Sequence, residues 1–137
     1  MSLKRIIKNS PQYIYSIIVV IAVLYLTLAP KPLPDNDIHL FEGADKVVHA
    51  IMFFGVMICL ALDYIRKRSH VSATPLFLFC IVTIAFGGAI EFIQDWMGLG
   101  RSKDFFDFIA DSIGAIVALI LALYYRTRFI EWLQEPR

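Results

Sequence analysis

Four long apolar runs, separated by shorter polar segments, dominate the chain. They cover roughly residues 13–29, 47–64, 76–93 and 108–125. Each has about 17 to 20 residues, enough for a helix to cross a hydrocarbon core of about 30 Å. Lipid offers no partner to free backbone groups, and the short alternating strands of a closed barrel are not visible in the sequence. The pattern therefore predicts an all-α polytopic membrane protein, a bundle of four transmembrane helices.

Composition supports this class. Of the 137 residues, 58% are hydrophobic and 18% are charged, and the mean hydropathy is +0.66. A soluble domain is about half apolar and about a quarter charged. The length allows a single membrane domain, 1–137, and its expected partner is the lipid bilayer. The net charge of +1 gives no basic field for nucleic acid, so no nucleic-acid partner is expected.

Basic residues predict the orientation. Nine of the thirteen Lys and Arg residues lie in the N-terminal segment, the loop 65–75 or the tail 126–137. The other four are Lys31, Lys46, Arg101 and Lys103. The positive-inside rule therefore predicts that both termini are cytoplasmic and that the loop 30–44 lies outside. The tail has two interpretations, a helix lying flat on the inner surface or a continuation of the fourth span.

Polar residues from three segments gather at the predicted outer end. They open the second span, close the third, and enter the fourth from the loop before it. These candidate ligand-binding residues are Lys46, His49, Glu91, Gln94, Arg101, Asp107 and Asp111. A charge at the bilayer centre costs about 2.5–3.5 kcal/mol on insertion scales, so such residues usually face a bundle interior or a watery cavity. The pattern predicts an outward-facing site.

Small residues indicate how the last two spans pack. Gly114, Ala118 and Ala122 form a small-xxx-small stripe, and Gly87 lies one turn before Glu91. Small residues let helix backbones approach, so we expect the third and fourth spans to form a tight hairpin. Two interpretations of Asp104 stay open, a cap of the fourth helix and a solvated side chain.

Two stretches contain these polar residues in a fixed order. They are Asp45-Lys46-Val47-Val48-His49 and the ordered set Glu91, Gln94, Arg101, Asp107, Asp111 and Gly114. In these two stretches the chain resembles the VanZ-like family of bacterial integral membrane proteins. The member that gives the family its name is associated with low-level resistance to the glycopeptide antibiotic teicoplanin. The resemblance implies a bacterial cytoplasmic membrane and a role at the cell envelope.

Three functions are consistent with this arrangement. The first is binding or transport of an anionic envelope ligand, a lipid phosphate or a glycopeptide carboxylate, with Lys46, Arg101 and Lys103 as cationic contacts. The second is an enzyme acting on a lipid-linked phosphate, such as a cell-wall precursor. In it magnesium is held by Glu91, Asp107 and Asp111, and His49 and Glu91 are the catalytic candidates. The third is a structural membrane partner whose buried ion pairs fix the helix register.

Overall fold

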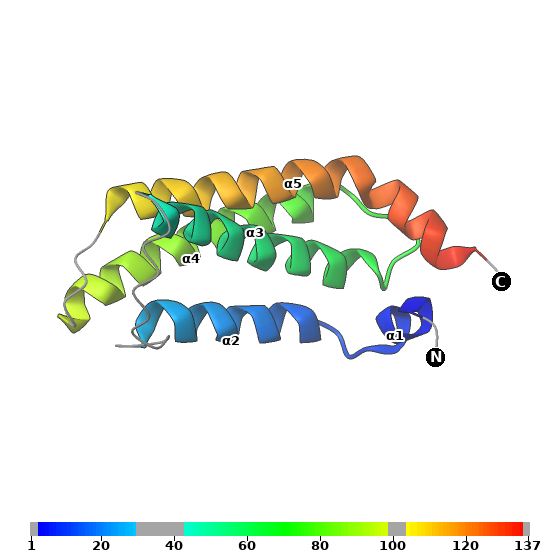
Figure 1. Cartoon of the computed structure of the whole chain (residues 1–137). Coiled ribbons are helices and arrows are strands. Elements are labelled where there is room, and N and C mark those ends of the chain that lie inside the picture. The colour runs from blue at the N-terminus through cyan, green and yellow to red at the C-terminus, as the bar shows by residue number, and fades with distance from the viewer. Residues whose placement is uncertain (1–2, 30–42, 99–103, 136–137) are drawn as a thin grey trace.

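Five helices make up the part of the chain that the structure, a computed structural model, describes: residues 3–29, 43–98 and 104–135. No strand occurs among these residues. The helices are α1 (Leu3–Asn9), α2 (Ile14–Leu28), α3 (Ala44–Ile65), α4 (Thr74–Met97) and α5 (Phe105–Gln134) (Figure 1). The predicted all-α class is therefore confirmed.

Three of these helices, α3, α4 and α5, are each long and apolar enough to cross a membrane. With its 15 residues, α2 is roughly 22 Å long, less than a hydrocarbon core of about 30 Å. It qualifies only together with α1, to which it is bent by 84°. The chain is thus a multi-pass membrane protein, and its described residues contain three candidate spans, or four when the bent pair counts as one.

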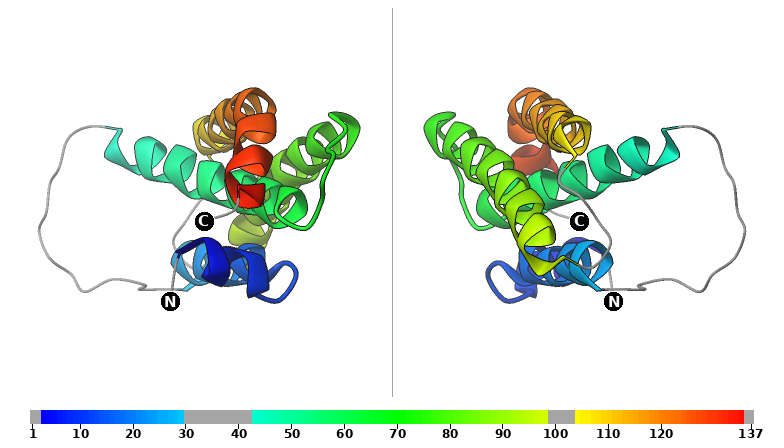
Figure 2. Two further views of the ribbon diagram at one scale, coloured as in Figure 1. Left: turned by 90° about the vertical axis from the view of Figure 1, so that its right-hand side faces the viewer. Right: turned by 90° about the vertical axis from the view of Figure 1, so that its left-hand side faces the viewer.

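The helices form a bundle in which α5 and α2 lie on opposite sides, with α3 and α4 crossing between them (Figures 1 and 2). The last turns of α5 bend toward α1, and the helix continues to Gln134 (Figure 1). There the Lys4 ammonium lies 3.6 Å from Glu135 and 5.0 Å from the ring centroid of Trp132. The first and last helices therefore meet at one end of the bundle. That this end is cytoplasmic stays a prediction from the basic residues.

The most extensive helix pairing is that of α3 with α5. A Cβ atom added at Gly114 of α5 would lie 2.0 Å from the carbonyl oxygen of Ala50 in α3. The expectation that this stripe packs on the preceding helix is therefore wrong for its first residue. The expectation rested on α4 and α5 being consecutive in the chain, which favours a hairpin. Gly114, which has no side chain, instead lies where two helix backbones approach most closely. The second of these helices is α3.

A buried ion pair fixes the bend between α1 and α2. Asp63, in the last turns of α3, accepts hydrogen bonds from the backbone and hydroxyl of Ser16, at 2.9 and 2.7 Å. It also accepts one from the Arg66 guanidinium at 2.9 Å, and both charged side chains are fully buried. That guanidinium donates further to the carbonyls of Ile7, Ser10 and Pro11. In the sequence Arg66 stands out only as one of the basic residues of the loop 65–75, and Asp63 was not a candidate residue.

The close approach of α3 and α5 predicts opposite outcomes for two glycine substitutions. In Gly114→Ala the new methyl group meets backbone, so the helices must separate, at a cost of about 2 kcal/mol or more. At Gly55 a Cβ would lie 3.7 Å from Val19, an ordinary contact, so Gly55→Ala is expected to be neutral or stabilising. Unfolding in mixed micelles, followed by circular dichroism, measures both. Equal stability of the two variants would contradict the packing described here.

The buried ion pair predicts a compensating double substitution. Arg66→Met leaves the Asp63 carboxylate charged and unpaired, and we expect a loss of about 3–5 kcal/mol in unfolding free energy. Asp63→Leu combined with Arg66→Met removes both charges and should recover much of that loss. The same unfolding assay tests both. If the double variant is no more stable than Arg66→Met, the bend between α1 and α2 does not depend on the ion pair of Asp63 with Arg66.

Candidate functional site

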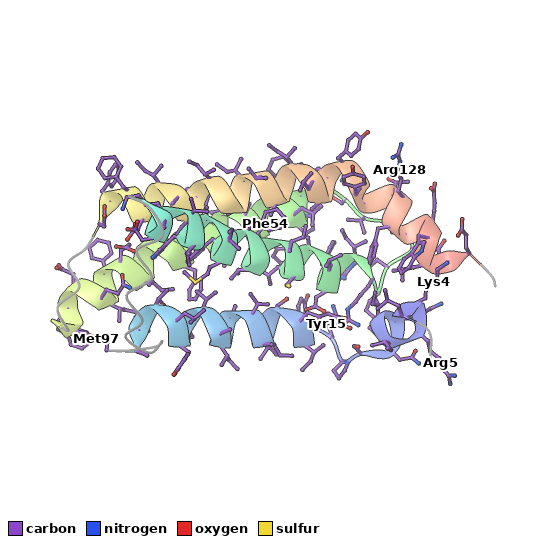
Figure 3. All side chains as sticks on the ribbon, viewed as in Figure 1. Lys4, Arg5, Tyr15, Phe54, Met97 and Arg128 are labelled. Carbon is purple, nitrogen blue, oxygen red and sulfur yellow. The ribbon has the colours of Figure 1, made fainter. Side chains whose placement is uncertain are left out.

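Three helices each place one ionisable side chain in a buried cluster near the start of α5. These are His49 from α3, Glu91 from α4 and Asp111 from α5. The His49 Nδ1 atom lies 3.0 Å from Asp111 Oδ1. A ring nitrogen of His49 and one oxygen from each carboxylate all lie within 4.8 Å of one another. Figure 3 shows oxygen atoms gathered at this end of the bundle, the end that Met97 marks. We call these three residues the buried triad.

Glycines position the triad. His49 directly precedes Ala50, and Asp111 lies one turn before Gly114, so the contact between those backbones aligns the two side chains. On α4, a Cβ atom added at Gly87 would lie 2.9 Å from Asp111 Oδ2. A side chain there would displace the carboxylate. Gly87 therefore leaves the space that Asp111 occupies between α4 and α5.

Each carboxylate of the triad has one oxygen engaged and one left over. Glu91 is 2% exposed and Asp111 is 0% exposed. The Oε2 atom of Glu91 accepts the backbone N–H of Asp104 at 3.0 Å, and Oδ1 of Asp111 faces His49. Glu91 Oε1 and Asp111 Oδ2 are buried and have no hydrogen-bond partner among the residues described. Two unsatisfied carboxylate oxygens in one cluster are costly unless something binds them.

Around the triad lies a rim of exposed and half-buried charges, centred on Lys46. Its ammonium contacts one oxygen each of Asp45, Asp104 and Asp107, at 2.9, 3.1 and 3.2 Å. The second oxygen of Asp107 lies 3.8 Å from His49 Nε2 and so connects the rim to the triad. Because three carboxylates already surround it, Lys46 has little positive charge to offer a ligand.

Asp104 is the N-cap of α5. Its Oδ1 atom accepts the Phe106 backbone N–H at 2.8 Å. This hydrogen bond, together with that from Lys46, holds the pKa of Asp104 below its usual value. A lowered pKa means that the ionised form stabilises the fold above the ordinary Asp pKa of about 3.9, and that this is lost as the pH falls through the lowered value. Of the two interpretations of Asp104, the cap is observed.

The other candidate residues divide into two groups. His49, Glu91 and Asp111 come together, with Lys46 and Asp107 at their rim. The buried Gln94 instead donates from Nε2 to the Thr27 carbonyl oxygen at 2.9 Å, which ties α4 to α2. Arg101 lies outside the described residues. Asp45 and Asp104 were not among the candidates. Asp45 is next to Lys46 in the sequence and Asp104 is three residues before Asp107, and this spacing could have identified both as members of the charged cluster.

Comparisons with known proteins agree with the sequence pattern. The profile of the VanZ/LLP1 family matches residues 4–126, a range that contains the triad and its rim. A protein of Schizosaccharomyces pombe, described only as uncharacterized, is 32% identical over 123 residues, which is 88% of this chain and 68% of the relative. No solved structure matches. Because that relative is from a yeast, a bacterial membrane and teicoplanin resistance stay predictions, while the matched profile places the chain in the VanZ/LLP1 family.

Proposed function

We propose that the protein binds a divalent cation at the buried triad and, through that cation, the anionic head group of a membrane or cell-envelope ligand. The observation that carries the proposal is that Glu91 and Asp111 each have a buried oxygen without a partner among the described residues. These two residues and His49 each offer one ligand atom, and the three atoms lie within 4.8 Å of one another. Two carboxylates this close repel each other unless a proton or a cation lies between them. A cation satisfies both oxygens at once.

The donor set narrows the choice of cation. Carboxylate oxygens suit magnesium and manganese, and an imidazole nitrogen also suits zinc. Histidines that bind metals usually donate their other N–H to a carboxylate, as the contact between His49 and Asp111 allows. Magnesium is typically held by one or two protein carboxylates plus substrate phosphates. A phosphate is accordingly the ligand chemistry that this site favours.

Charge also supports capture of the anion through a metal rather than by lysine alone. The part of the sequence assigned to this end has nine acidic residues and four basic ones, a net charge of −5. Lys46 is already surrounded by three carboxylates. Such a field repels a free anion and attracts a divalent cation. Arg101 remains a predicted second contact to the bound anion.

A metal-assisted enzyme is the second candidate function. It is favoured by the Nδ1 contact of His49 with Asp111, because a base held by a carboxylate partner is a common catalytic arrangement. In this version the triad would hold the cation, which would supply an activated water, and His49 or Glu91 would take a proton from that water. The water oxygen would bond to phosphorus while the phosphorus–oxygen bond to the lipid breaks, and the lipid would leave as an alcohol after taking up a proton from the protonated base or from solvent. Both functions require the same cation site, so the same first experiment tests both.

Cation binding is tested with manganese, magnesium and zinc on the detergent-purified full chain. We expect one manganese ion per chain by electron paramagnetic resonance, and a stabilisation of about 2.7 kcal/mol at a concentration one hundred times Kd. Glu91→Gln and Asp111→Asn should each abolish both the manganese binding and the stabilisation. Asp95→Asn, which changes an exposed acid on the same helix as Glu91, should bind as the native chain does.

The outcomes of that experiment are distinct. If none of the three metals binds the native chain, or if Asp95→Asn loses as much binding as Asp111→Asn, the cation proposal is wrong. The triad would then be part of a buried ion-pair network that fixes the helix register, the third of the functions that the sequence allows. Unfolding without metal, measured for each variant, separates lost binding from lost folding.

Ligand capture is tested with a photoactivatable polyprenyl phosphate. Labelling of the native chain should require the divalent cation and disappear with a chelator, because the phosphate binds the metal and not Lys46. Arg101→Ala should weaken labelling further when the cation is present. Labelling that persists at full yield in chelator and in Asp111→Asn would overturn the metal-mediated mechanism while leaving direct anion binding as the explanation.

A further inference from the structure

A narrow groove follows the contact between α3 and α5 toward the end where α5 finishes. Its volume is about 260 Å³. It runs from Phe54, which Figure 3 places near the middle of the bundle, to Arg126 and Phe129. Ile58 and Leu62 line it from α3 and Leu121 from α5. Apart from Arg126, every lining residue is apolar or aromatic.

Arg126 gives this groove a chemical preference. Its Nη1 atom is buried and has no hydrogen-bond partner among the described residues. Two of the three acidic residues at this end already face other cations, Asp63 with Arg66 and Glu135 with Lys4. A buried guanidinium nitrogen without an acceptor is costly, and a phosphate is its best geometric match. The surface of the groove is therefore apolar, and a guanidinium that lacks an acceptor borders it.

The position of Arg126 along the bundle fits the head-group level of a bilayer. Tyr125 directly precedes it, and Tyr124 packs on Tyr125 with ring centroids 4.8 Å apart. Trp132 follows two turns later on the same helix. Tyrosine and tryptophan collect at the membrane–water boundary. An anion on Arg126 would thus lie at the surface, and a hydrocarbon chain attached to it would run inward along the groove.

We propose that this groove binds an anionic phospholipid of the adjacent leaflet, with its phosphate on Arg126 and one hydrocarbon chain between α3 and α5. A groove of about 260 Å³ holds part of one hydrocarbon chain and is too small for a partner helix. A second, larger groove of about 410 Å³ runs from Phe54 to Lys46, but three carboxylates already neutralise that lysine. Of these two apolar grooves, the one beside Arg126 is therefore the one expected to select an anionic lipid. This site lies at the opposite end from the triad and does not depend on the proposed function.

Native mass spectrometry of the full chain in detergent tests the proposal. The protein is incubated with equal amounts of dioleoyl phosphatidylglycerol and dioleoyl phosphatidylcholine. The native chain should retain one phosphatidylglycerol in preference to phosphatidylcholine. Arg126→Gln should weaken that binding at least about tenfold, because a charged hydrogen bond to phosphate is lost. The control is Arg128→Gln, two residues on, where the guanidinium lies 5.8 Å from the ring centroid of Tyr124.

A second pair of variants tests the hydrocarbon channel. Leu121→Trp fills the groove and should reduce retention of phosphatidylglycerol, whereas Ile120→Trp, at a 59% exposed position that does not line it, should not. Soluble glycerol phosphate at the same concentration should fail to displace the lipid. If Arg128→Gln loses as much as Arg126→Gln, if Leu121→Trp has no effect, or if glycerol phosphate competes equally, the proposed lipid site is wrong.

Discussion

The contact between Gly114 and the backbone of Ala50 is the constraint on which the charged site depends. It brings α3 and α5 to their closest approach, and no larger residue fits there. His49 and Asp111 lie one residue and one turn away from this contact, so the backbone approach sets the distance between the imidazole and the carboxylate. The site is therefore positioned by rigid helix packing rather than by a loop. Side chains on packed helices are held in place more precisely than side chains on loops.

Polar contacts attach α2 to this core. Apolar packing in a bilayer gains little, because lipid chains solvate an apolar helix face about as well as another helix does. Ser16 near one end of α2 binds the buried Asp63, and the Thr27 carbonyl near the other end accepts from Gln94. Two polar contacts, one at each end, fix both the depth and the rotation of a helix that is short for a membrane span. Gln94 accordingly has a structural partner outside the triad.

The two ends of the bundle treat charge in opposite ways. At the triad, carboxylates outnumber cations and two of their oxygens are left over. Near the end of α5, a guanidinium nitrogen is left over beside an apolar groove. The unpartnered carboxylate oxygens favour a cation, such as a metal ion. The unpartnered guanidinium nitrogen favours an anion, such as a phosphate. Since the low dielectric of the bilayer makes each unpaired group expensive, these are the places where binding is expected.

The sequence by itself determined the helical class, the approximate spans and most of the charged residues that meet at one end, but not the contacts of Asp45 and Asp104 with Lys46. These follow from hydropathy and helical spacing, because a bilayer forces apolar length and internal hydrogen bonding on every span. Only the tertiary structure decided the rest: that Gly114 meets α3, that Gln94 turns to α2, that Asp63 and Arg66 form a buried pair, and which carboxylate oxygens are left without partners. The physical reason is that periodicity fixes which face of a helix a residue occupies, whereas the rotation of one helix against another depends on the fit of all the side chains between them.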